Sequence, residues 1–160
     1  MGGQVPAVTT PSAAAQFRGF LARYDPAVAA EARRALTKTR ALVPGAVEMV
    51  YDNYNALVVG FGPSEQASEA VLSLAIFPRW VTLCFLQNGP ELPDPQKLLK
   101  GSGNAVRHVR LTSADDLDTP AVKALIRGAL RKADVPIEKS AKRRMVIKSV
   151  SVKQRPRKRP

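Results

Sequence analysis

The sequence predicts an α+β fold: two N-terminal helices, about five mainly antiparallel strands and one C-terminal helix. Apolar residues recur at helical spacing before residue 44 and after residue 118. Several β-rich runs separated by turn residues lie between these helical stretches. Strands and helices do not alternate, which excludes a fold built of parallel βαβ units. The 160 residues fit one domain. We predict a flexible lead-in at 1–11, an α+β domain at 12–138 and a basic tail at 139–160.

The two N-terminal helices are predicted from their caps and their apolar faces. Ser12 can cap the first helix. The face that follows is made of apolar residues three or four positions apart: Phe17, Phe20, Leu21 and Tyr24. The dipeptide Asp25-Pro26 begins the second helix, because proline is well tolerated at the first helical position. Pro44-Gly45 ends that helix.

The middle of the chain is predicted to form a sheet. Its β-rich runs are 47–52, 56–61, 71–77, 80–87 and 106–111. Pro78-Arg79 makes a tight turn between two of them, which predicts an antiparallel hairpin. This hairpin is almost continuously apolar, so we expect helices to cover both of its faces. Asp118-Thr119-Pro120 then opens the C-terminal helix.

Positive charge is concentrated at the end of the chain. The net charge is +12, from 25 Lys+Arg and 13 Asp+Glu, and ten of the basic residues and no acidic residue lie in 139–160. The remaining chain is therefore nearly balanced. A basic tail that neutralises phosphates would bind nucleic acid or another polyanion; the alternative is a solvated tail that binds nothing. The candidate polyanion-binding residues are Lys142, Arg143, Arg144, Lys148, Arg155, Arg157, Lys158 and Arg159. Within this segment, Met145–Val152 has strong β propensity and is a candidate edge strand.

The sequence shows no catalytic signature and no metal-binding signature. His108 is the only histidine and Cys84 the only cysteine, so the usual zinc-ligand sets cannot form and an internal disulfide is excluded. Asp115, Asp116 and Asp118 cluster where a helix N-terminus favours negative charge, so capping is preferred over metal binding. We predict no cofactor, no membrane segment and a cytoplasmic location.

One group of polar and aromatic residues is a candidate small-molecule pocket. Tyrosines and carboxylates gather at 48–54, and Trp80 and two residues of the last predicted strand could join them. The alternative is that these residues satisfy one another across a hairpin. The candidate pocket residues are Glu48, Tyr51, Asp52, Tyr54, Trp80, Arg107 and His108.

Several segments resemble the YdhG-like family, a bacterial family catalogued as domain of unknown function 1801. The likeness covers roughly residues 15–133 and rests on Leu83–Asn88 with Gly89, Leu98–Gly101, Arg107–Leu111, Ala121–Ala129 and Glu48–Pro63. It implies a small α+β fold with helices against an antiparallel sheet. Some members are described as frataxin-like iron chaperones, which implies acidic residues that present ferrous iron.

Three functions remain open. The first is a non-enzymatic domain whose body binds a small molecule or a protein and whose tail contacts a polyanion, most plausibly nucleic acid. The second, implied by the resemblance alone, is iron delivery; the predicted N-terminal helices carry many cations, such as Arg33, Arg34 and Lys38, which would repel Fe²⁺. The third is an enzyme of unknown reaction that uses His108 with the patch at 51–55.

Overall fold

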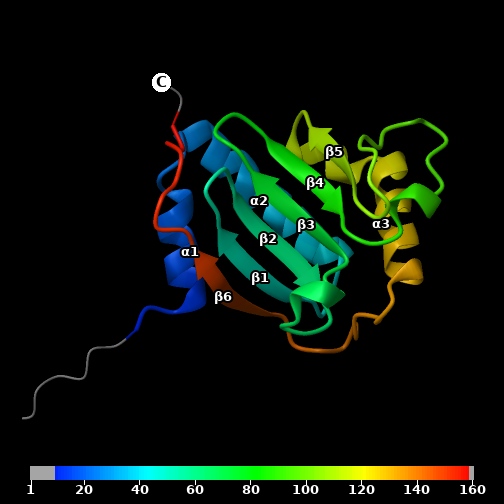
Figure 1. Cartoon of the computed structure of the whole chain (residues 1–160), viewed down its shortest axis with the longest axis horizontal. Coiled ribbons are helices and arrows are strands. Elements are labelled where there is room, and N and C mark those ends of the chain that lie inside the picture. The colour runs from blue at the N-terminus through cyan, green and yellow to red at the C-terminus, as the bar shows by residue number, and fades with distance from the viewer. Residues whose placement is uncertain (1–9, 159–160) are drawn as a thin grey trace, which may run out of the picture.

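The computed structural model describes residues 10–158 and has the predicted α+β architecture (Figure 1). Most of the predicted lead-in, residues 1–9, lies outside the described residues. The helices are α1 (Ala13–Leu21), α2 (Pro26–Leu42) and α3 (Pro120–Lys132). The strands are β1 (Val47–Asp52), β2 (Leu57–Gly62), β3 (Leu72–Ile76), β4 (Val81–Phe85), β5 (Arg107–Leu111) and β6 (Arg144–Val150). Short 3₁₀ turns are η1 (Ala67–Glu69), η2 (Gly89–Glu91) and η3 (Ala114–Asp118).

The six strands form one sheet in the order β5-β4-β3-β2-β1-β6 (Figure 1). The strands β1 to β5 make a meander in which each pair is antiparallel, including the predicted β3–β4 hairpin. The sixth strand confirms the candidate edge strand in the basic segment, and it runs parallel to β1. The β1–β6 register shifts between Val50 and Tyr51.

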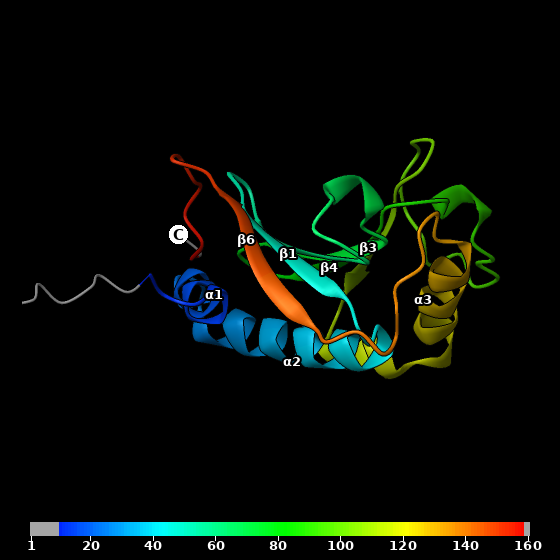
Figure 2. The same cartoon turned by 90° about the horizontal axis from the view of Figure 1, so that it is seen from below.

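The helices begin where their capping residues predict. The Ser12 hydroxyl accepts a hydrogen bond from the Ala15 N–H at 3.1 Å, and Pro26 is the first residue of α2. Thr119 caps α3 in the same way. Figure 2 shows α1 and α2 along one side of the sheet and α3 at its far end. Apolar residues of these three helices and of the strands form one continuous core.

Alternation along β1 assigns its residues to the two faces of the sheet. Val50 belongs to the core under the helices, so Glu48 and Asp52 point to the same side. Val47 and Met49 belong to a smaller cluster on the opposite face.

The face opposite the helices is not covered as the sequence predicted. The segment around η1 folds over one part of it, close to Gly62: a Cβ on that glycine would lie 3.1 Å from the Ala70 Cα. The β3–β4 hairpin presents small or hydroxyl-bearing side chains there, including Ser73, Ala75 and Thr82. All three are buried, so both faces of the hairpin are shielded from solvent as expected, but the helices pack on the other face of the sheet and the expected second helical layer was wrong.

The basic segment is part of the fold. Residues 151–158, which we call the C-terminal strap, follow β6 and lie along the turn between β1 and β2. The Ser151 N–H donates to the Asp52 carbonyl at 2.8 Å and the Arg155 N–H donates to the Tyr54 carbonyl at 2.9 Å. Gln154 is held from both sides, by the Asp52 carbonyl at 3.0 Å and by the Arg23 guanidinium at 2.5 Å. Within the described residues, the basic segment from Arg143 to Arg157 is therefore bonded to the rest of the domain.

Candidate functional site

A buried ion pair fixes the C-terminal strap to the sheet. Arg157 Nη2 lies 2.9 Å from Asp52 Oδ1, and both side chains are only 1% exposed. Arg157 also donates to the Tyr54 carbonyl at 3.3 Å. Arg23 Nη1 lies 3.7 Å from the other Asp52 oxygen. A buried carboxylate needs such partners, so Asp52 anchors the strap and is not open to a ligand.

Glu48 has a comparable structural role on the same face of β1. Its side chain has no solvent exposure, and Arg40 holds both carboxylate oxygens at 2.8 Å. Arg143 approaches the same carboxylate at 3.4 Å. The two strand acids thus bring two cations of the basic segment into the domain, and neither acid lines a pocket.

The remaining candidate pocket residues do not converge with these two. The Tyr51 hydroxyl contacts Met49 Sδ at 3.9 Å on the other face of β1. Arg107 and His108 lie on β5, four strand spacings or about 19 Å from β1. The Arg107 guanidinium donates to the Gly103 carbonyl at 2.6 Å, and the His108 backbone pairs with Lys100. Of the seven candidates, only Trp80 lines the groove between the C-terminal strap and two turns of the sheet, which we call the main groove.

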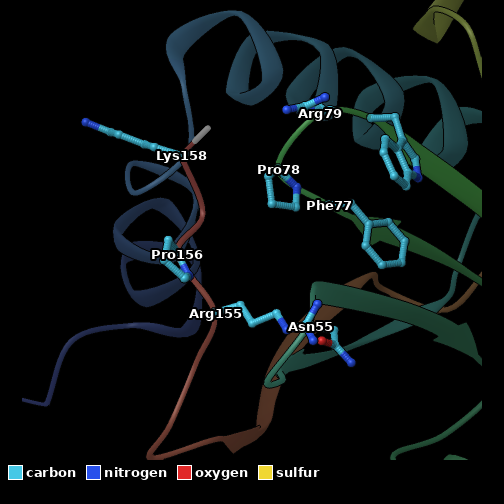
Figure 3. A pocket seen from close by; sticks show the side chains of 8 residues that line it. Asn55, Phe77, Pro78, Arg79, Arg155, Pro156 and Lys158 are labelled. Atoms are coloured by element: carbon cyan, nitrogen blue, oxygen red, sulfur yellow. The ribbon is translucent and has the colours of Figure 1, made fainter. Parts of the chain in front are cut away.

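The main groove lies between the C-terminal strap and two turns of the sheet (Figure 3). One turn joins β1 to β2 and the other joins β3 to β4. The volume of the groove is about 1040 Å³, and no carboxylate lines it. Its lining residues are Asn55, Phe77, Pro78, Arg79, Trp80, Arg155, Pro156 and Lys158.

Aromatic rings and cations lie close together in and beside this groove. The rings of Phe77 and Trp80 stack with their centroids 5.4 Å apart. The guanidinium of Arg110 lies 3.9 Å from the Trp80 ring centroid. Beside the groove, Tyr54 is 48% exposed, and the Arg155 guanidinium lies 5.6 Å from its ring centroid. An apolar surface with cations at its rim suits a ligand that combines a flat apolar part with negative charge.

The structure gives the candidate polyanion-binding residues different roles. Arg143, Arg144 and Arg157 form ion pairs with the domain's own carboxylates, and Lys148 donates to the Glu65 carbonyl. Only Arg155 and Lys158 line the main groove, and Lys142 is exposed. Arg159 lies outside the described residues. Much of the charge that the sequence assigned to an outside partner is therefore used within the domain.

The acidic cluster before α3 is bound to cations of α2. Lys38 Nζ lies 2.6 Å from Asp118 Oδ2, and this bond lowers the pKa of Asp118. Arg34 bonds to Asp115. Asp116 accepts hydrogen bonds from the N–H and the hydroxyl of Thr112, both at 2.8 Å. Within residues 10–158, no group of three or more His, Cys, Asp or Glu side chains is placed to hold a metal ion.

The cysteine and the histidine occupy the sheet face opposite the helices. Cys84 and His108 are cross-strand neighbours in the β4–β5 pair. Burial raises the pKa of the Cys84 thiol, partly offset by a hydrogen bond with Ser73. A raised thiol pKa opposes nucleophilic chemistry, which needs the thiolate.

Comparisons of the chain with family models, with curated proteins and with solved structures find no match. Across the described part of the chain, no helix combines the length and the apolar character needed to cross a bilayer.

Sequence reasoning missed half of the eight groove residues, namely Phe77, Pro78, Arg79 and Pro156, whereas Asn55 belongs to the patch at 51–55. The eight lining residues come from three separate segments, and only the docking of the strap brings these together. One signal was present in the sequence: two carboxylates that share one face of an apolar strand require buried cations. The basic segment supplies two of those cations, Arg143 and Arg157, and α2 supplies Arg40.

Proposed function

We propose that this protein is a non-enzymatic, cytoplasmic binding domain that holds an anionic ligand in the main groove. The observation that carries the proposal is the composition of the groove lining, which has three cations, two stacked aromatic rings and no carboxylate. The formal charge of +12 adds a long-range attraction for anions. Arg155 and Lys158 belong to the C-terminal strap, and Arg79 belongs to the turn between β3 and β4. A ligand in the groove would therefore contact both segments.

Membership of the YdhG-like family, expected from the resemblance of the segments named above, stays a prediction. Iron delivery also stays a prediction. The carboxylates that it would draw on before α3 are already bonded to Arg34 and Lys38. We therefore place the anion-binding groove first.

The proposal can be tested with the protein's own fluorescence, because Trp80 is the only tryptophan and lines the groove. Inorganic polyphosphate titrated at an ionic strength of about 0.15 M, where the Debye length is about 8 Å, should change Trp80 emission to a saturating value. The double variant Arg79→Gln/Lys158→Gln removes two exposed groove cations. Each charged hydrogen bond contributes about 1.5–3 kcal/mol, so the double variant should bind polyphosphate at least tenfold more weakly than the wild type.

The matched control is Lys142→Gln, which removes an exposed cation of the same basic segment away from the groove. It should bind within about twofold of the wild type, since surface charges are screened over about a Debye length. The proposal is refuted if polyphosphate leaves Trp80 emission unchanged and shows no binding by calorimetry. It is also refuted if Lys142→Gln weakens binding as much as the groove variant.

A further inference from the structure

The groove combines the two features that single-stranded nucleic acid requires, a cationic path and aromatic platforms. We infer that the anionic ligand is a single-stranded nucleic acid, whose bases stack on the aromatic residues and whose phosphates contact the cations. The inference rests on the proposed function and goes beyond it by naming the chemical class of the ligand. It takes up the polyanion suggested by the basic segment, but at a site built from that segment and the body together.

The stacking platforms are the first argument. Tyr54, the exposed aromatic ring beside the groove, is covered by Arg155 at 5.6 Å. A guanidinium and a nucleobase are both flat and both stack on aromatic rings, so a base can take the place of Arg155 and leave it free for a phosphate. Phe77, half-buried and stacked on Trp80, offers a second ring within the groove. Stacking on rings needs unpaired bases, which a duplex does not present.

The extent of the surface is the second argument. A second hollow of about 480 Å³ adjoins the main groove, and the two share Arg79 and Trp80. Arg110 lines this hollow. Its one carboxylate, Glu31, already accepts a hydrogen bond from the Ala114 N–H at 2.7 Å.

Four cations therefore line the two hollows: Arg155 and Lys158 line the main groove, Arg110 lines the second hollow, and Arg79 is shared by both. The main groove alone, at about 1040 Å³, is already at the upper end of the usual size for a small-molecule site. Two adjoining hollows of this extent fit a chain of several nucleotides better than one compact molecule. Asn55, also in the lining, can donate to and accept from a base edge.

The test compares four probes by Trp80 fluorescence and by calorimetry at two salt concentrations. The probes are an oligothymidylate of about eight nucleotides, an abasic strand of the same length, a duplex of the same length, and inorganic polyphosphate. The oligothymidylate should bind at least about fivefold tighter than the abasic strand, which is the least that one stacked base contributes. It should also bind tighter than the duplex.

Two variants separate the stacking from the charge. Tyr54→Ser removes an exposed ring and leaves the charge unchanged, so it should weaken oligothymidylate binding about fivefold or more and leave abasic-strand binding unchanged. Arg79→Gln should reduce the salt slope of oligothymidylate binding by about 0.7. Lys142→Gln, outside the groove, should leave that slope within error of the wild type.

The outcomes distinguish this inference from the proposed function. Equal binding of the oligothymidylate and the abasic strand, or an unchanged ratio between them in Tyr54→Ser, overturns the nucleic-acid assignment but leaves an anion-binding groove. Tighter binding of the duplex overturns the single-strand assignment. Absence of binding by every probe overturns both proposals.

Discussion

Replacing Arg157 with methionine should destabilise the protein by about 3 kcal/mol. The change leaves Asp52 charged and 1% exposed without its main partner. Removing one member of a buried pair costs about 3–5 kcal/mol. We expect the lower end of that range, because Arg23 remains 3.7 Å from the second carboxylate oxygen. Urea unfolding should show a lower midpoint with an unchanged slope, and the melting temperature should fall by about 6–12 °C.

Two further variants isolate the ion pair as the cause. The double variant Asp52→Asn/Arg157→Met leaves no buried charge, so it should regain most of the lost stability. Lys153→Met changes an exposed cation in the same strap and should stay within about 0.5 kcal/mol of the wild type. A loss below about 1 kcal/mol for Arg157→Met, or no recovery in the double variant, would refute the claim that this pair anchors the strap.

Three other changes test separate parts of the fold. Gly45→Ala should cost about 2–4 kcal/mol in urea unfolding, because φ is +82° and the new Cβ would clash with the Glu138 carbonyl oxygen. Tyr24→Phe should cost about 1–3 kcal/mol, since two buried backbone groups at Ile76 and Leu57 lose the Tyr24 hydroxyl. Burial raises the pKa of Tyr24 above 10.0, so its contribution is complete below pH 10 and is lost as pH rises further; the variant should flatten that alkaline loss. The pKa of Asp118 is lowered from 3.8 by its bond to Lys38, so its contribution is lost as pH falls below about 4, and Asp118→Asn should reduce that acid loss.

The local elements of the fold were predictable because their signals are local. Ser12, Pro26 and Thr119 act at helix starts through bonds or backbone angles within a few residues. The hairpin at Pro78-Arg79 is likewise set by its own turn and its flanking strands. The strand in the basic segment was a candidate for the same reason, since its β propensity is visible in the sequence.

The site was not predictable in the same way. Asp52 and Arg157 are 105 positions apart, and nothing in either segment names the other as partner. An acid-free run of cations has the composition of a solvated tail, and composition takes no account of unpaired carboxylates elsewhere in the chain. Tyr51 and His108 were grouped with Glu48 by residue type, while strand order and alternation separate them. Strand order depends on the packing of the whole domain, which a local pattern does not reveal.

The parallel pairing of β6 with β1 has a consequence for how the chain reaches its folded state. The strand that completes the edge of β1 is made about a hundred residues later than β1 itself. Until it arrives, the edge offers unpaired backbone groups to any other strand. Contacts so distant in sequence also form slowly. Fragments that lack residues 143–158 should therefore self-associate, with Glu48 deprived of Arg143 and Asp52 of Arg157 at the open edge.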